Sequence, residues 1–164
     1  MTIKVGDSIP ASTFKWMGPD SEIDVRNSTS DEIFKGKKVA VFGLPGAYTP
    51  VCSAEHLPGF VDIAKKLLDK GVDTIACISV NDPFVMDAWS KAQNVGDNIM
   101  MLCDPTAEFT NAIGLKLDLS DFGLGDRSER YSMLVDDGVI TALNVEESIL
   151  ACDASSANAL LEQA

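Results

Sequence analysis

A cysteine in the segment LPGAYTPVCSAEH stands where a thiol would ionise readily. Thr49 is a favoured N-cap residue, Pro50 suits the first position of a helix, and Cys52 then falls in the first turn. Free backbone N–H groups and the positive end of the helix dipole meet in that turn and stabilise a thiolate. The charge of Glu55, in the same turn, opposes this effect. These residues leave two interpretations open, a reactive thiolate at Cys52 and a buried cysteine in an ordinarily capped helix.

The other three cysteines, at positions 77, 103 and 152, are spread along the chain, and the sequence contains no C-x-x-C pair. A structural zinc site needs close pairs of cysteine or histidine, so such a site is disfavoured. The chain has one histidine, His56, one helical turn after Cys52. That spacing could bring it near the sulfur, but we expect it in packing or at an interface. In a reducing compartment a cysteine is by default a small buried hydrophobic residue.

Composition limits the class of protein. The chain has 164 residues, 46% of them hydrophobic and 23% charged, which predicts one globular domain spanning residues 1–164. Its net charge of -12 repels phosphate backbones and anionic lipids, which disfavours nucleic acid and membrane surfaces as partners. The N-terminal segment lacks the apolar core of a signal peptide, and no apolar run is long enough to span a bilayer. We therefore expect a cytoplasmic protein.

Strand and helix patterns alternate along the chain. The run KKVAVFGL is apolar and β-branched, which predicts a buried strand. Apolar residues then recur at steps of three and four, which predicts a helix ending before Gly71. Asp136-Asp137-Gly138 between two apolar runs indicates a hairpin. The predicted strands cover residues 37–44, 72–80, 99–103, 131–135 and 139–145, the predicted helices cover 52–70, 83–93, 104–114 and 155–163, and residues 12–26 predict a small hairpin.

This order of elements predicts an α/β fold, a three-layer sandwich around a mixed central sheet. Asp82 is the predicted cap of the helix 83–93, and Phe84, Met86 and Trp89 in that helix are expected in the core.

The segment PGAYTPVC, residues 45–52, resembles the P-x-x-x-T-x-x-C active-site motif of the peroxiredoxins. Further segments resemble the type II or "five" subgroup of that family, in the same order: CSAEHLPGF, SVNDPFVMDAW, CDPTAEFT, GLGDRSERYSMLVDDG and ALNVE. The resemblance covers nearly the whole chain. It implies a thioredoxin-like fold and a thiol-dependent peroxidase of antioxidant defence, which reduces hydrogen peroxide and alkyl hydroperoxides without a metal or organic cofactor.

The resemblance also implies roles for individual residues. Cys52 resembles the peroxidatic cysteine, which attacks the hydroperoxide and becomes a sulfenic acid. Thr49 resembles the threonine that aligns the peroxide, and Pro45 resembles the proline that shields the site from water. Arg130 directly precedes an aromatic residue and resembles the arginine that stabilises the negative charge of the transition state. Arg127 is the less favoured candidate for that role.

Three routes could regenerate the sulfenic acid. Cys77 stands at the separation from Cys52 that plant type II members use for a resolving cysteine, although it falls inside a predicted strand. Cys152 lies near the position used by animal members, although the preceding loop is shorter here. We favour the third route, in which glutathione, glutaredoxin or thioredoxin reduces Cys52 directly. Cys103 is expected to be structural, and the resemblance implies a homodimer built from loops near the active site.

The sequence also bears on three functions other than a peroxidase. A thioredoxin-like disulfide reductase needs C-x-x-C at the helix start, and Glu55 takes the place of its second cysteine, which excludes that class. A redox sensor would use Cys52 once per protein rather than in many turnovers. An α/β domain with four buried cysteines would show ordinary thiol reactivity throughout.

Overall fold

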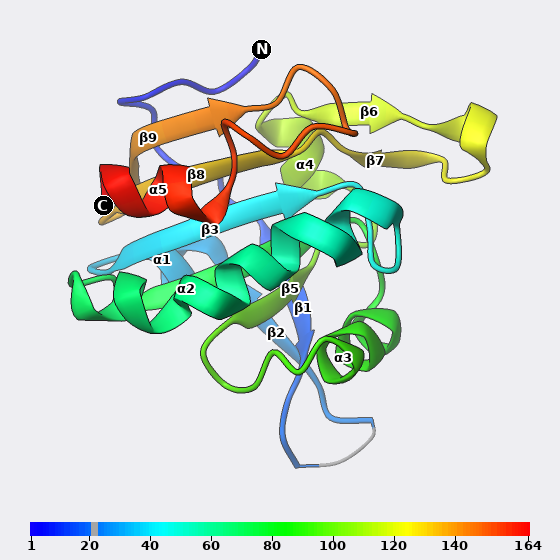
Figure 1. The fold of residues 1–164 in the computed structure, drawn as a ribbon, viewed down its shortest axis with the longest axis horizontal. Coiled ribbons are helices and arrows are strands. Elements are labelled where there is room, and N and C mark those ends of the chain that lie inside the picture. Colours follow the sequence, from blue (N-terminus) through cyan, green and yellow to red (C-terminus); the bar gives the residue numbers. More distant parts are fainter. Residues whose placement is uncertain (21–22) are drawn as a thin grey trace.

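The computed structural model describes residues 1–20 and 23–164, and its described part contains a central sheet of seven strands (Figure 1). These strands are β1 (Thr13–Met17), β2 (Val25–Thr29), β3 (Lys38–Leu44), β4 (Thr74–Ser79), β5 (Met100–Cys103), β8 (Tyr131–Asp136) and β9 (Val139–Val145). Their order across the sheet is β2-β1-β5-β4-β3-β8-β9. The central strands β3, β4 and β5 are parallel, and the outer strands pair antiparallel, so the sheet is mixed.

Helices cover both faces of this sheet. They are α1 (Ser30–Phe34), α2 (Leu57–Asp69), α3 (Pro83–Ala92), α4 (Glu108–Ala112) and α5 (Ala157–Gln163). One hydrophobic core joins α2, α3 and α5 to one face of the sheet, and a second core joins α1 and α4 to the other (Figure 1). The predicted α/β three-layer sandwich with a mixed sheet is confirmed.

One predicted helix is much shorter than expected. The pattern of residues 104–114 predicts a helix, but α4 begins only at Glu108. Asp104 stays outside the helix because its carboxylate accepts hydrogen bonds from the backbone N–H groups of Phe109 and Thr110 and from the Thr110 hydroxyl. A carboxylate that accepts hydrogen bonds from the first N–H groups of a helix belongs to a residue that precedes the helix.

Four further features differ from the sequence prediction. The hairpin of residues 12–26 continues to Thr29, and it joins the main sheet through Lys15 opposite Cys103. Residues 21 and 22 of that predicted hairpin lie outside the described residues. Helix α1 and the small hairpin of β6 (Lys116–Asp118) and β7 (Asp126–Ser128) were not predicted. Phe84, expected in the core, is 54% exposed.

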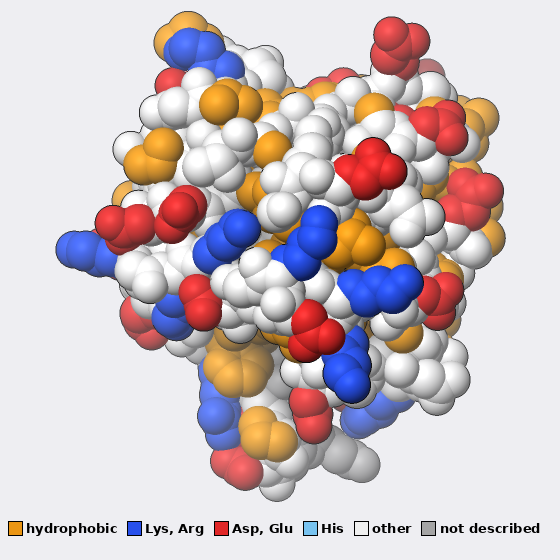
Figure 2. Space-filling view, turned by 60° about the vertical axis from the view of Figure 1, so that its left-hand side comes forward, with side chains coloured by type: hydrophobic (Ala, Val, Ile, Leu, Met, Phe, Trp, Pro, Cys, Tyr) orange, Lys and Arg blue, Asp and Glu red, His pale blue; other side chains and the backbone are white. Residues whose placement is uncertain are grey.

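Figure 2 looks at the side of the molecule that lies at the left of Figure 1. Lysine and arginine side chains gather near the middle of this face, with carboxylates between and around them. Charges of both signs interleave there, so they cancel one another at long range. No helix in the described part of the chain is long and apolar enough to cross a membrane.

Candidate active site

Cys52 lies where the central strand β3 ends and the chain turns toward α2. The first helical hydrogen bond joins the Ser53 N–H to the Thr49 carbonyl at 3.0 Å, so Cys52 falls in the first turn, as the sequence predicted. Its side chain is fully buried. The indole N–H of Trp89 in α3 donates to the Ser53 hydroxyl at 3.0 Å and ties this turn to the neighbouring helix.

The turn that carries Cys52 is π-helical rather than α-helical. The π-helix η1 (Cys52–His56) precedes α2, and the Leu57 N–H donates to the Cys52 carbonyl. Pro58 explains the interruption of the predicted helix 52–70, because it has no N–H for the Ala54 carbonyl and its ring would collide with that carbonyl in an α-helix. The wider turn accommodates the proline, and such turns are frequent at functional sites.

Arg130 reaches the thiol through the pairing of β8 with β3. It directly precedes β8, whose first residue, Tyr131, lies opposite Gly43 near the end of β3. Its Nη2 atom donates to Cys52 Sγ at 3.2 Å, and the residue is only 2% exposed. Nη2 and Nε also donate to the Ile149 carbonyl, at 2.9 and 3.3 Å. A buried cation held at this distance stabilises a thiolate.

His56, which the sequence favoured for packing or an interface, contacts Arg130 in the site. Its Nδ1 accepts a hydrogen bond from Arg130 Nη1 at 3.0 Å, because a guanidinium can only donate. Nε2 therefore carries the ring proton and donates it to the Ser155 carbonyl at 2.9 Å. Burial, and then the charge of Arg130, lowers the pKa of His56 to about 3, so the ring is neutral at neutral pH. The helical spacing of His56 from Cys52 was the only signal in the sequence.

The loop before the helix is held from two sides. Arg127, the less favoured of the two candidate arginines, donates from Nη1 to the Pro45 carbonyl at 3.3 Å. Asn81 Oδ1 accepts from the Ala47 N–H at 3.0 Å. Pro45 and Gly46 are buried, and a Cβ at Gly46 would collide with the Arg127 guanidinium. A larger residue at position 46 would therefore require the end of the Arg127 side chain to shift.

Thr49 contributes its backbone to the helix and its hydroxyl to the loop. The hydroxyl donates to the Gly46 carbonyl at 2.7 Å. The first helical N–H, that of Ser53, therefore donates to the backbone carbonyl of Thr49 and not to its side chain. With its proton engaged, the Thr49 oxygen keeps lone pairs that can accept from a ligand. The side chain is half-buried, one turn before Cys52.

The remaining three thiols have different surroundings. Cys77 lies in the middle of β4 with no exposed surface, and its burial, reinforced by the nearby Cys52 and Cys103, raises its pKa well above the ordinary value. Burial also raises the pKa of Cys103 to about 12 and that of the half-buried Cys152 to about 11. All three are protonated at neutral pH, which makes them poor nucleophiles as they stand.

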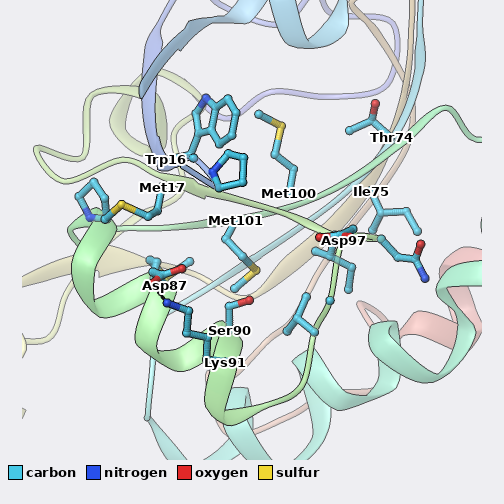
Figure 3. Close-up of a pocket in the computed structure, with 18 of the residues that line it drawn as sticks. Trp16, Met17, Thr74, Ile75, Asp87, Ser90, Lys91, Asp97, Met100 and Met101 are labelled. Carbon is cyan, nitrogen blue, oxygen red and sulfur yellow. Dashed lines mark ion pairs between the residues drawn. The ribbon is translucent and has the colours of Figure 1, made fainter. Parts of the chain in front are cut away.

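Two cavities lie beside the site rather than in it. One of about 390 Å³ borders Cys152 and Glu55. The larger, about 960 Å³, opens between α3, the residues 94–101 and the end of β1 (Figure 3). Its walls include four of the six methionines, Met17, Met86, Met100 and Met101. Among the described residues, neither wall includes Cys52 or Arg130, and no group of three or more His, Cys, Asp or Glu side chains could hold a metal ion.

Sequence comparison identifies relatives over most of the chain. Residues 4–161 match the Redoxin family. The chain is 50% identical over 148 residues to the chloroplastic peroxiredoxin-2E of Arabidopsis thaliana, a match that covers 89% of this chain but 63% of that protein. It therefore spans less than two thirds of the length of that relative. It is 45% identical over 144 residues to peroxiredoxin-2B of Arabidopsis thaliana, with 88% of each chain covered.

Solved structures agree with this assignment. Reduced Prx3 from Vibrio vulnificus in complex with H2O2 superposes with a TM-score of 0.92 at 44% identity, over 99% of both chains. Peroxiredoxin 5 from Alvinella pompejana gives a TM-score of 0.83 at 37% identity, over 98% of this chain and 96% of that one. The fold is therefore the thioredoxin-like fold of these structures, and the protein belongs to the redoxin family as a peroxiredoxin of type II.

Proposed function

We propose that the protein is a thiol-dependent peroxidase in which Cys52 reduces hydrogen peroxide and alkyl hydroperoxides. The observation that carries this proposal is the contact of Arg130 Nη2 with Cys52 Sγ at 3.2 Å, both groups being buried. A helix start and an adjacent guanidinium both stabilise a thiolate, which is the nucleophilic form of cysteine. The peroxiredoxin names of the relatives support the same activity.

In the proposed reaction, the Cys52 thiolate attacks the nearer oxygen of the hydroperoxide in line with the O–O bond. The S–O bond forms as the O–O bond breaks, so sulfur is oxidised to a sulfenic acid and the second oxygen leaves as hydroxide or alkoxide. That oxygen takes a proton from solvent and departs as water or an alcohol. Negative charge moves from sulfur to oxygen during the step, and Arg130 stabilises it at both positions.

Thr49 and Pro45 prepare the substrate in this proposal. Because the Thr49 hydroxyl donates to the Gly46 carbonyl, its oxygen accepts the O–H of the peroxide and keeps the O–O bond aligned with the sulfur. Pro45, buried beside this loop, keeps water from the thiolate and the nascent sulfenic acid.

An external thiol completes the cycle. It attacks the sulfur of the sulfenic acid, water leaves, and a second thiol then releases Cys52 from the mixed disulfide. We favour glutathione, glutaredoxin or thioredoxin as this reductant over Cys77 and Cys152, whose thiols have raised pKa values. Cys77 is also enclosed within β4, so a disulfide to it would require the turn at Cys52 to open.

We also place this activity in a cytoplasmic, single-domain homodimer. Reduction by glutathione or thioredoxin needs a compartment that supplies thiols, as the cytoplasm does. Several large hydrophobic side chains are exposed on the surface of the described chain. They include Tyr48, Phe84, Phe122 and Leu150, exposed by 58%, 54%, 74% and 72%. Exposed apolar groups of this size suit a contact with a second copy of the chain.

Peroxide consumption by the reduced protein tests the proposal. We expect many peroxides to be consumed per protein when glutathione and glutaredoxin, or thioredoxin and its reductase, are present, and none by a Cys52→Ser variant. A sulfenic-acid trap followed by peptide mass spectrometry should mark Cys52. Cys152→Ser should keep its turnover if the reductant is external. One peroxide per protein would indicate a sensor, and no reaction in folded, reduced protein would overturn the proposal.

A further inference from the structure

Glu146 is a buried carboxylate that the reaction described above does not use. It follows β9 directly and is 8% exposed. Its backbone N–H donates to the Arg130 carbonyl at 2.9 Å, so it lies beside the catalytic arginine on the neighbouring strand. Its Oε1 atom accepts two hydrogen bonds, from the N–H groups of Asp153 and Ser155, both at 2.8 Å. One oxygen thereby fixes the far end of the loop that connects β9 to α5.

That loop supplies two carbonyl groups that accept hydrogen bonds from the active site, one from the guanidinium of Arg130 and one from the imidazole of His56. The Ile149 carbonyl accepts hydrogen bonds from Nε and Nη2 of Arg130, and the Ser155 carbonyl accepts the ring proton of His56. The Ser155 N–H and carbonyl therefore join Glu146 to His56, and His56 joins Arg130. The contacts form a closed ring, which starts at the Glu146 backbone and returns to its side chain.

We propose that Glu146 is a positioning residue for the active site, which holds the loop 149–155 so that its carbonyls aim Arg130 at Cys52 and keep His56 in its tautomer. The proposal rests on the proposed peroxidase function. Without the carboxylate the two loop N–H groups lose their acceptor and the loop relaxes toward solvent. The Ile149 carbonyl then no longer holds Arg130 in place, and the Ser155 carbonyl no longer holds His56. The distance between the guanidinium and the sulfur becomes variable.

Variants of Glu146 can separate the effect of its hydrogen bonds from the effect of its charge. A glutamine has one carbonyl oxygen that can accept both N–H bonds, so Glu146→Gln keeps the loop in place without the negative charge. Glu146→Ala removes the acceptor altogether. Glu147 is the adjacent carboxylate and is exposed. Glu147→Ala is therefore a control that removes one negative charge and leaves the hydrogen bonds of Glu146 intact.

The experiment measures thiolate formation at Cys52 and its rate with hydrogen peroxide. Thiolate formation at Cys52 is followed as the difference in absorbance between each protein and its Cys52→Ser counterpart, because burial raises the pKa of the other three thiols. We expect Glu146→Ala to move the midpoint of this titration to higher pH and to slow the reaction with peroxide by about 10- to 100-fold. Glu146→Gln should restore both values to within a few-fold of the parent, and Glu147→Ala should change neither. An unchanged midpoint and rate in folded Glu146→Ala protein would overturn the proposal.

One further variant keeps the experiment decisive if Glu146→Ala is unstable. If Glu146→Ala protein does not fold, Glu146→Asp retains the charge and withdraws the oxygen by one methylene, and a titration midpoint equal to that of the parent would overturn the proposal. The titration needs no peroxide turnover. If the parent protein consumes no peroxide, the peroxidase proposal fails, while the shift of the midpoint still decides the role of Glu146.

Discussion

At Arg130 the shape of the side chain matters as much as its charge. Its N–H groups meet Cys52, His56 and Ile149 at once, and the point-like ammonium of a lysine cannot make all three contacts. We expect Arg130→Lys to slow the reaction of Cys52 with hydrogen peroxide by about 100-fold, measured by stopped flow. Arg26→Lys, on the edge strand β2, is the matched control and should keep the parent rate. An unchanged rate in folded Arg130→Lys protein would remove Arg130 from the mechanism.

His56 makes folding stability depend on pH. Its pKa in the folded protein is about 3 against an ordinary 6.5, because burial and then the charge of Arg130 disfavour the protonated ring. Between these values the unfolded chain binds a proton that the folded protein does not, so stability falls as the pH is lowered. One proton gives a slope of at most about 1.4 kcal/mol per pH unit. Guanidinium unfolding should show this loss between pH 6.5 and about 5, above the carboxylate range.

The control for this pH effect is His56→Gln, which cannot bind a proton at that position. Its unfolding free energy should change less with pH over the same window. Equal slopes in the two proteins would mean that the ring of His56 is not held neutral by its surroundings.

The residues of the site differ in how far the sequence could identify them. Cys52 and Thr49 stand together in a local helix-start pattern, and Arg130 stands next to an aromatic residue in a recognisable segment. His56 could not be assigned in this way, because its role depends on the Ser155 carbonyl, 99 residues further along the chain, and on Arg130. Hydrogen bonds between such distant positions leave no period or motif in the sequence.

At the scale of elements, α3 supports the turn that carries Cys52. The buried Trp89 N–H donates to the Ser53 hydroxyl at 3.0 Å. Ser53→Ala leaves that N–H buried without an acceptor, which should cost about 1–3 kcal/mol of unfolding free energy. Hydrogen exchange of the amides in η1 should also become faster, because the turn loses its tie to α3. Ser90→Ala, a half-buried serine on α3, is the control and should affect neither measurement.

Long, periodic elements could be predicted, and short or interrupted ones could not. The strands β3 and β4 and the helices α2 and α3 follow from apolar runs of sufficient length. The strands β6 and β7 have three residues each, too few to establish a period. Pro58 signalled the π-helical turn, and Thr29 with Glu32 forms a capping box that signalled α1, but both signals are weak without the packing around them.

For the whole molecule, the proposed dimer makes a direct prediction. Phe84 is 54% exposed at the second position of α3, where an aspartate is compatible with the helix start. We expect Phe84→Asp to weaken self-association by about 30-fold or more, measured by sedimentation velocity over a range of concentrations. Val5→Asp, at another exposed apolar residue, is the control for charge and should leave association unchanged. A parent protein that sediments as a monomer throughout would contradict the dimer itself.

The large cavity has a consequence for how the molecule ages under oxidative stress. Met17, Met100 and Met101 line its walls and are half-buried, so small oxidants reach their thioethers. A thioether reacts with peroxide more slowly than an activated thiolate, and its product is a polar sulfoxide. In the proposed reaction an external thiol regenerates Cys52 in every cycle, whereas these sulfur atoms take no part in that cycle. We therefore expect peroxide that escapes reduction to convert these thioethers to sulfoxides, which would make the walls of the cavity more polar.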